Sequence, residues 1–269
     1  MLIIKIGGGA AINIEGIVAD LANLREPFLI VHGANALRDR LATSLDIPRK
    51  TLTSVSGYSS VYSDASMLDL LMMAYAGLKN KRIVERCQQH GLNTIGLTGL
   101  DGAIIRGRRN RGIRIRENGK VRIVRDLSGK PREINLELLQ WLLSSGYVPV
   151  LTVPIIDETG TAINSENDDL VVLLQQATGA QRIIQLIEAP GLLANPADPT
   201  SRIAHLTPSE LAEWEERVTG RMKRKLRALK RLVEQGVQQI LISDGRTEHP
   251  IQDALNGKGT IIQCMPFGN

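Results

Sequence analysis

The sequence predicts an α/β fold, specifically a three-layer α/β/α sandwich around a mostly parallel central sheet. The chain has 269 residues with 43% hydrophobic side chains, enough for a full core in one large domain or two lobes. Short apolar runs alternate with segments of helical periodicity along the whole length, the pattern of a layered α/β protein. A division between residues 151 and 162 would give two lobes of one fold, 1–150 and 151–269.

The strands are expected where apolar runs have no polar face, because both faces of a parallel sheet are covered by helices. These runs are residues 2–6, 27–33, 94–99, 147–154, 182–187 and 238–243. Helical patterns lie between them, at residues 65–78, 79–90, 136–144 and 170–178.

Composition restricts the class of protein. Aromatic residues make up only 3% of the chain, which argues against stacking platforms for single-stranded nucleic acid. Cys87 and Cys264 have no metal-ligand spacing, so we expect a reducing compartment, the cytoplasm. The apolar run before Gly7 is too short for a signal peptide or a membrane span, and no later stretch reaches that length.

The positive charge is concentrated in two patches. Residues 106–132 contain eleven Lys or Arg and two Asp or Glu, a local charge of +9, whereas the whole chain carries +5. Residues 221–231 add seven basic residues and no acid. Within the first patch, Asn118-Gly119 between two β-rich runs predicts a hairpin. This hairpin either is a solvated edge kept basic against aggregation or binds an acidic partner.

Two glycine turns follow predicted strands. In "KIGGG", Lys5 precedes Gly7 and Gly8, and in "VHGAN" a strand ends before Gly33 and Ala34. Such turns allow backbone N–H groups to approach an anion closely, and two of them at neighbouring strands would face one another across a crevice. Taken alone the signal is weak, because a tight strand-to-helix turn has the same residues. His32 lacks a partner at motif spacing, so we expect a structural role for it.

The segment 162–174 combines an amide with several acids. Asn164 and Asp168 are spaced i, i+4 and share a face if the turn is helical. The alternative is that Asn164 or Ser165 caps the helix and the acids complement its dipole.

Residues 219–236 predict an amphipathic helix. Met222, Leu226, Leu229 and Val233 fall on one face, and most basic residues point away from it. Lys225 lies inside the apolar arc, where a charged lysine must meet an anion to offset its desolvation.

Together these motifs resemble the amino acid kinase family, in its N-acetylglutamate kinase branch. The resemblance extends in order over essentially the whole chain, through "AGLKNKRIVE" (76–85), "GLTGLDG" (96–102), "PGLLAN" (190–195) and "NGKGTII" (256–262). "GLDG", the "ENGKVRIVR" hairpin and "GRMKRK" are especially similar to the subgroup that acts on α-aminoadipate carried by LysW, a small acidic amino-group carrier protein.

The resemblance implies a reaction and its residues. Family members transfer the γ-phosphoryl group of ATP to a side-chain carboxylate and form an acyl phosphate, with Mg²⁺ carried mainly on ATP. Lys5 and Lys225 would stabilise the phosphoryl group in transfer, and Asp168 would hold both lysines. The remaining roles fall to phosphate-cradling amides at Gly7, Gly8, Gly33 and Ala34, to Asn164 for the substrate, and to Glu188, Gly191 and Leu192 along the nucleotide. A carboxylate acceptor is already ionised at neutral pH, so no general base is required.

The same resemblance assigns partners. The lobe 1–150 would bind the substrate and form a homodimer, and the lobe 151–269 would bind ATP. A kinase for a LysW-linked amino acid must dock an acidic protein, which gives the basic hairpin a function. Its docking residues would be Arg114, Arg116, Lys120, Arg122 and Arg125.

Three positions depart from the family pattern. Related kinases have a substrate-binding arginine where this chain has Val61, which offers neither charge nor donor. Ala34 replaces a glycine, and Glu188 replaces an aspartate. Two alternatives therefore stay open: a kinase for free N-acetylglutamate, and a catalytically silent basic protein that is regulatory or binds nucleic acid. Whether the carried substrate is α-aminoadipate for lysine synthesis, glutamate for arginine synthesis, or both also stays open.

Overall fold

The computed structural model describes residues 1–117, 119–218 and 220–263. Its centre is an eight-stranded sheet in which every pairing is parallel except β15 with β16. The order of its strands is β14 (His205–Leu206), β16 (Thr260–Gln263), β15 (Gln239–Asp244), β13 (Arg182–Ile187), β1 (Leu2–Ile6), β2 (Phe28–His32), β10 (Val148–Thr152) and β5 (Thr94–Thr98). The predicted α/β class and the six predicted strands are confirmed.

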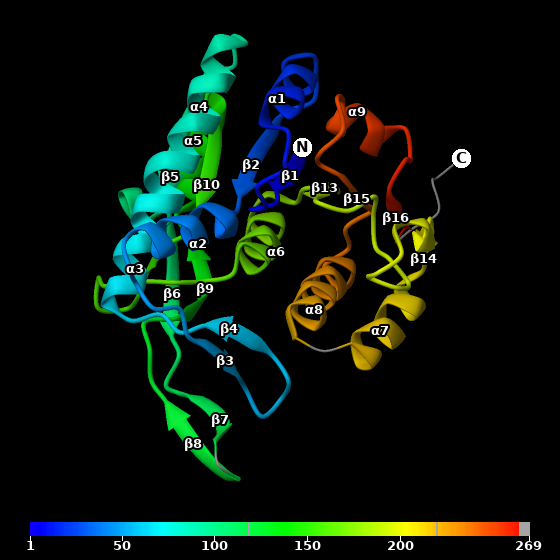
Figure 1. Ribbon diagram of the computed structural model, residues 1–269. Helices are drawn as coiled ribbons and strands as arrows, with labels where there is room; N and C mark the ends of the chain where they lie inside the picture. Colours follow the sequence, from blue (N-terminus) through cyan, green and yellow to red (C-terminus); the bar gives the residue numbers. More distant parts are fainter. Residues whose placement is uncertain (118, 219, 264–269) are drawn as a thin grey trace.

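Helices cover both faces of this sheet and bury one apolar cluster on each (Figure 1). One face is covered by α1 (Ile14–Ala22), α4 (Asn80–Gln89) and α9 (Pro250–Leu255). The opposite face is covered by α2 (Asn35–Ser44), α3 (Ala65–Leu71), α5 (Leu136–Ser144), α6 (Asn167–Thr178), α7 (Pro208–Arg217) and α8 (Gly220–Glu234). A π-helical segment, Met72–Lys79, joins α3 to α4, so the predicted helices at 65–78 and 79–90 form one continuous rod.

The two-residue period of β1 decides where its lysine lies. Ile4 and Ile6 pack in the cluster under α1, whereas Ile3 packs in the cluster under α6 and α8. Because side chains alternate along a strand, Lys5 shares the face of Ile3 and is directed toward α6 and α8. Gln185 is paired with Lys5 in the adjacent strand β13 and lies on the same face.

Smaller sheets project from the N-terminal half of the chain. A four-stranded sheet has the order β12 (Ala162–Ile163), β11 (Ile155–Ile156), β6 (Ile105–Arg109) and β9 (Gly129–Ile134). Two hairpins are formed by β3 (Thr51–Thr53) with β4 (Ser59–Val61) and by β7 (Ile113–Glu117) with β8 (Lys120–Val124). The second confirms the predicted basic hairpin, which we call the β7–β8 hairpin. Gly119 has a φ of +75°, a conformation that favours glycine, and Asn118 lies outside the described residues.

The loop between β3 and β4 connects the hairpin to the C-terminal half. The N–H of Val55 donates to the carbonyl of Arg114 at 2.8 Å, and the N–H of Gly220 donates to the carbonyl of Gly57 at 3.1 Å. In Figure 1 this loop accordingly lies between the β7–β8 hairpin and α8. The β7–β8 hairpin, the β3–β4 loop and the start of α8, which are far apart in the sequence, are thus joined to one another.

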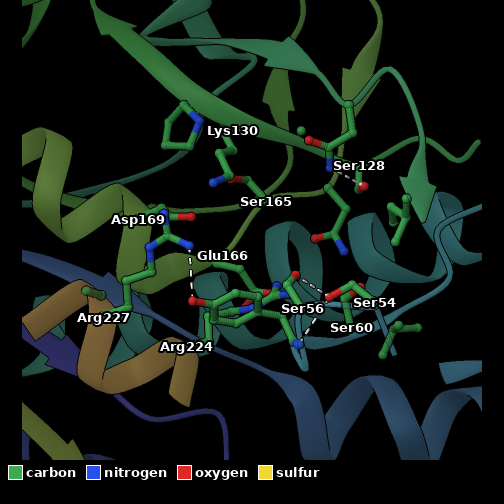
Figure 2. A pocket seen from close by; sticks show the side chains of 18 of the residues that line it. Ser54, Ser56, Ser60, Ser128, Lys130, Ser165, Glu166, Asp169, Arg224 and Arg227 are labelled. Atoms are coloured by element: carbon green, nitrogen blue, oxygen red, sulfur yellow. Dashed lines mark hydrogen bonds and ion pairs between the residues drawn. The ribbon is translucent and has the colours of Figure 1, made fainter. Parts of the chain in front are cut away.

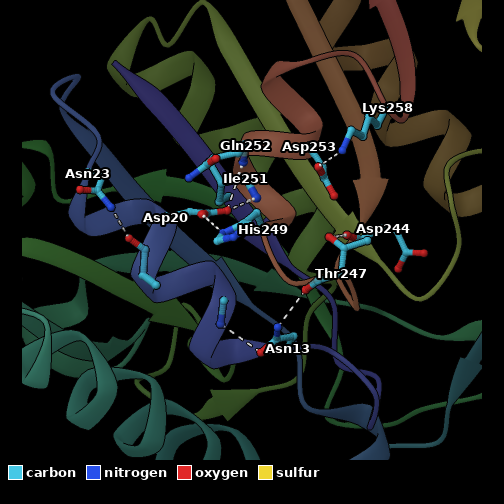
Figure 3. Close-up of polar contacts among 12 residues, drawn as sticks. Asn13, Asp20, Asn23, Asp244, Thr247, His249, Ile251, Gln252, Asp253 and Lys258 are labelled. Carbon is cyan, nitrogen blue, oxygen red and sulfur yellow. Dashed lines mark hydrogen bonds and ion pairs between the residues drawn. The ribbon is translucent and has the colours of Figure 1, made fainter.

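Polar contacts also join both ends of α1 to α9 and to the segment before it (Figure 3). Asp20, near the end of α1, accepts hydrogen bonds from the N–H groups of Ile251 at 2.9 Å and Gln252 at 3.1 Å, at the first turn of α9. Asn13 caps α1 and donates to the carbonyl of Thr247 at 2.8 Å. These bonds hold the helix that follows the first glycine turn against the segment that follows β15.

The predicted division into lobes after residue 150 stays a prediction, and residue 150 itself lies within β10. One sequence expectation needs adjustment. Met222 is 38% exposed, whereas Leu226 and Leu229 are buried, so the apolar face of α8 begins one turn later than predicted.

Cys87 is buried with a free thiol, and Cys264 lies outside the described residues. None of the helices in the described ranges is long and apolar enough to cross a membrane.

Candidate active site

Two lysines from distant parts of the chain meet one carboxylate. The ammonium nitrogen of Lys5 lies 2.5 Å from Oδ1 of Asp168, and that of Lys225 lies 3.8 Å from the same oxygen. Lys225 also donates to Oε1 of Gln185 at 2.9 Å. All three charged side chains are at most 17% exposed. The spatial grouping expected for Lys5, Asp168 and Lys225 is therefore present, and Lys225 is largely enclosed and meets an anion, as its place in the apolar arc predicted.

The pKa values of Asp168 and Lys225 are both lowered. Burial on its own would raise the pKa of Asp168, but Lys225 and Lys5 lower it to about 2, so the carboxylate is ionised. Burial lowers the pKa of Lys225 to about 8, against the opposing effect of Asp168. The group thus holds two cations and one anion in a largely dry site, with a surplus of positive charge.

The two glycine turns touch each other, as expected for turns at neighbouring strands. The N–H of Ala36 donates to the carbonyl of Gly8 at 2.9 Å. A Cβ atom at Gly8 would lie 2.1 Å from the side-chain oxygen of Asn35 and 2.7 Å from the backbone nitrogen of Ala34. Only glycine fits position 8 at this separation.

Not all amides of these turns are available to a ligand. The N–H of Gly7 donates to the carbonyl of Leu186 at 2.8 Å, and that of Gly33 donates to Ile6 at 2.9 Å. Contrary to expectation, the N–H groups of Gly7 and Gly33 are therefore engaged within the fold. A contact of Ala34 with a phosphate stays a prediction. In the part of the chain that the structure describes, the N–H of Gly8 has no acceptor.

Asn164 is placed by a different structure from the one expected. Helix α6 begins at Asn167, and its cap residue Glu166 makes no side-chain cap hydrogen bond. The predictions that Asn164 shares a helical turn with Asp168 and that Asn164 or Ser165 caps the helix are therefore wrong. Asn164 is extended: its backbone bonds Leu127 at 2.8 Å and Gly129 at 2.9 Å, and its amide donates to the hydroxyl of Ser63 at 2.9 Å.

The predicted nucleotide residues follow β13. The carboxylate of Glu188 accepts a hydrogen bond from the N–H of Ala11 at 2.5 Å and lies against Gly9. Gly191 approaches Thr260 closely, since a Cβ atom there would lie 2.6 Å from the threonine hydroxyl. Leu192 is buried, and its N–H donates to that hydroxyl at 2.8 Å. Contact of Glu188, Gly191 and Leu192 with a nucleotide stays a prediction.

His32 has the structural role expected of it. It is fully buried, and its Nε2 lies 3.1 Å from the amide nitrogen of Asn80. Burial lowers the pKa of His32 to about 3, so the ring is neutral and supports the β2 turn.

A cavity of about 660 Å³ is lined by Asp169 and Arg224, which directly follow Asp168 and precede Lys225 in the sequence, but not by the lysine pair itself. Its walls come from the β3–β4 loop, the β7–β8 hairpin, the start of β9, the segment before α6 and one side of α8 (Figure 2). Val61 and Asn164 line it. Two carboxylates, Glu166 and Asp169, face six cationic side chains, which are Arg114, Lys130, Arg132, Arg224, Arg227 and Arg231. The cavity thus favours an anionic ligand.

The β7–β8 hairpin extends this positive surface. Its five predicted docking residues are all exposed: Arg114, Arg116, Lys120, Arg122 and Arg125. Arg122 pairs with Glu117 at 3.1 Å, and no ion pair within the described residues engages the other four. Arg114 also lines the cavity, so the exposed patch and the cavity are continuous.

The comparisons with known proteins identify the family. The model of the amino acid kinase family matches residues 1–244. The chain belongs to this family. The chain is similar to the [LysW]-aminoadipate kinase of Thermus thermophilus, with 39% identity over 98% of this chain and 100% of the relative. The acetylglutamate kinase of Methanopyrus kandleri is 30% identical over 98% and 100% of the two chains. N-acetylglutamate synthase from Neisseria gonorrhoeae shares the fold, with a TM-score of 0.78 at 18% identity over 99% of this chain and 60% of that one.

In this amino acid kinase, three residues near the site escaped the sequence analysis. Gln185 is a polar residue inside the otherwise apolar run "RIIQLI". A polar side chain at that position of a buried strand could have indicated that β13 contributes to a site. Buried Asp126 accepts hydrogen bonds from the N–H of Ser63 at 3.2 Å and from the hydroxyl of Ser128. Asp126 thereby fixes the position of Ser63, whose own hydroxyl accepts the hydrogen bond from the Asn164 amide. Lys130 lies at the end of the basic patch and gave no signal distinct from its neighbours.

Proposed function

We propose that this protein is an ATP-dependent kinase that phosphorylates the side-chain carboxylate of α-aminoadipate carried by an acidic, LysW-like carrier protein. The product is an acyl phosphate. The observation that carries the proposal is the Lys5–Asp168–Lys225 group, whose sequence neighbours Asp169 and Arg224 line a positively charged cavity that continues onto an exposed basic hairpin. The similarity over the full length to the [LysW]-aminoadipate kinase of Thermus thermophilus supports it.

Phosphoryl transfer requires positioning and charge stabilisation more than covalent catalysis. Lys5 and Lys225 supply two ammonium groups, and Asp168 holds both in one place. During transfer, the bond between the γ-phosphorus of ATP and its bridging oxygen breaks, a bond from phosphorus to the carboxylate oxygen forms, and ADP leaves. The lysines stabilise the negative charge on the phosphoryl oxygens, and the free N–H of Gly8 adds a donor at the turn.

Magnesium fits this site as a companion of ATP. Among the described residues, no group of three or more His, Cys, Asp or Glu side chains could hold a metal ion. Phosphate oxygens would therefore supply most of its ligands, as is usual for Mg²⁺ in kinases. When bound, the ion would neutralise charge on the phosphates.

The carrier explains the basic hairpin. A substrate attached to an acidic protein has to be delivered to the cavity while the protein remains outside it, and the positive charge of the hairpin favours that approach. The residues expected to dock it are those of the exposed patch, with Arg114 at the cavity entrance. A carrier bearing glutamate would use the same surface, and the similarity of this chain to the [LysW]-aminoadipate/[LysW]-glutamate kinase of Saccharolobus solfataricus, at 31% identity, supports this.

The division of labour between residues 1–150 and 151–269, the homodimer and the cytoplasmic location stay predictions. The substrate cavity is lined mainly by residues before 170, and the predicted nucleotide residues follow β13. This arrangement is consistent with substrate binding in the N-terminal part and ATP binding in the C-terminal part.

The test is ADP release with Mg-ATP in separate reactions. One contains an acidic carrier bearing α-aminoadipate, a second the carrier bearing glutamate, and a third free N-acetylglutamate. We expect turnover with a loaded carrier and no turnover with the free amino acid. Turnover with free N-acetylglutamate alone would support the second candidate, an acetylglutamate kinase. Inactivity with all three, together with salt-sensitive binding to many nucleic-acid sequences, would support the silent binding protein.

A further inference from the structure

The cavity must bind a second carboxylate, a requirement that rests on the proposed function. α-Aminoadipate has two carboxyl groups. Its side-chain carboxylate accepts the phosphoryl group, while its α-carboxylate stays ionised throughout the reaction. Val61 lines the cavity and cannot bind a carboxylate, because it has no charge and no donor. A cation elsewhere in this cavity has to bind it.

Most cations on the α8 side of the cavity are already engaged. Arg224 forms an ion pair with Glu166, and Arg231 pairs with Asp169 at 2.9 Å. Arg227 donates to the hydroxyl of Tyr58 at 3.1 Å and lies 5.4 Å from the centre of its ring. These side chains shape the wall, and binding a substrate through them would require breaking existing contacts.

Lys130 is the exception close to Asn164. It is the second residue of β9, and the residue before it, Gly129, donates its N–H to the carbonyl of Asn164 at 2.9 Å. Figure 2 shows its side chain in the pocket near Ser165 and Asp169. Lys130 is an exposed residue that lines the cavity, and within the described residues no ion pair or hydrogen bond engages its ammonium group.

The surroundings of Lys130 favour an incoming anion. Its pKa is lowered, first by partial burial and then by the positive charges of Arg227, Arg231 and Arg224, against which Asp169 acts. A carboxylate placed beside Lys130 would relieve this repulsion. The other unpaired cations lie further out: Arg114 belongs to the hairpin, and Arg132 also lines a second hollow with Arg106 and Arg108.

We propose that Lys130 binds the α-carboxylate of the carried amino acid. Its ammonium group forms a charge-assisted hydrogen bond with a carboxylate oxygen, while the amide of Asn164 and the lysine pair engage the reacting end of the substrate. Lys130 is a binding residue in this account and takes no part in bond breaking.

The experiment measures KM for two carriers, the normal one and one with an altered amino acid, with both the unmodified enzyme and a Lys130 variant. The altered substrate is the carrier bearing 5-aminopentanoate, which keeps the reacting carboxylate and lacks the α-carboxylate. For the unmodified enzyme we expect its KM to be at least about tenfold above that of the aminoadipate carrier, the size of one charge-assisted hydrogen bond. For Lys130→Gln we expect the same high KM with both carriers, with kcat and the KM for ATP close to those of the unmodified enzyme.

Lys120→Gln is the matched control, because it removes a lysine from the exposed hairpin. It is expected to affect both carriers equally. Val61→Arg in the Lys130→Gln background is expected to restore the preference for the α-carboxylate. If Lys130→Gln still distinguishes the two carriers as strongly as the unmodified enzyme does, the proposal is overturned. Failure of the unmodified enzyme to phosphorylate either carrier would instead overturn the proposed function, so the two failures are distinguishable.

Discussion

The molecule holds its positive charge in two contrasting ways. Around Asp168, two lysines that are at most 17% exposed are held by one carboxylate, and the pKa of Lys225 is lowered. On the β7–β8 hairpin, five basic residues are exposed, and Arg122 alone among them has an ion-pair partner within the described residues. The first group is preorganised at a cost in desolvation, whereas the second remains hydrated.

This difference separates the tasks that each group can perform. A buried, fixed ammonium stabilises charge strongly because no water screens it and no reorganisation is needed at the moment of reaction. Exposed arginines are screened within about 10 Å at ordinary salt, so they contribute mainly to the rate of encounter and the choice of partner. We therefore expect substitutions in the two regions to affect different kinetic constants.

The largest effect is expected for Lys225→Met. Loss of one ammonium from the buried site should lower kcat by a factor of about 100 to 1,000, the usual effect of removing a preorganised donor to transition-state charge. Lys230→Met is the matched control on the same helix, since Lys230 is more exposed and pairs with Glu215 outside the site. Steady-state kinetics of both variants, with circular dichroism to verify folding, tests this. Near-normal kcat in Lys225→Met would show that the site is misassigned.

A smaller effect is expected on the hairpin. Replacing Arg114, Arg116 and Arg125 with glutamine should lower kcat/KM for the loaded carrier about tenfold at low salt, through slower encounter. The kcat value should stay unchanged, and the difference should disappear at high salt because screening removes the attraction. Arg82→Gln, on the exposed surface of α4, serves as the control. A fall in kcat that persists at high salt would contradict the separation between the two regions.

The smallest effect is a shift in the pH profile. With a pKa of about 8, Lys225 loses its proton as the pH rises through 8, so kcat/KM for ATP should decline above that value. In Asp168→Asn the stabilising carboxylate charge is absent, and the pKa of Lys225 should fall further. The alkaline limb should then move down by about one pH unit or more. A profile in Asp168→Asn that declines at the same pH as in the unmodified enzyme would argue against coupling between these residues.

Local sequence patterns were sufficient to predict part of the fold and part of the candidate site. Continuous apolar runs located the central strands, and the arc position of Lys225 on an amphipathic helix indicated its burial. Contacts between distant segments were not accessible in the same way. The hydroxyl that holds Asn164 belongs to Ser63, 101 residues earlier, and the carbonyl that engages the Gly7 amide belongs to Leu186. Periodicity describes one element at a time, so neither partner could be assigned before the strands were placed side by side.

The residues that lead into α6 show why the i, i+4 spacing rule can give a wrong prediction. Asn164 and Asp168 satisfy the i, i+4 rule, yet Asn164 is held extended by backbone bonds to residues 127 and 129. Pairing with that neighbouring segment outweighs a local helical turn. Asn164 consequently faces the substrate cavity, while Asp168 faces the lysines.

The most direct test of the central claim is to trap the product. The enzyme would be incubated with Mg-ATP, hydroxylamine and the carrier bearing α-aminoadipate, and the carrier would be analysed by mass spectrometry. The account predicts one hydroxamate per carrier, located on the side-chain carboxyl group and absent when ATP or the loaded amino acid is omitted. ADP release without a carrier hydroxamate, or a hydroxamate formed on free N-acetylglutamate alone, would contradict it.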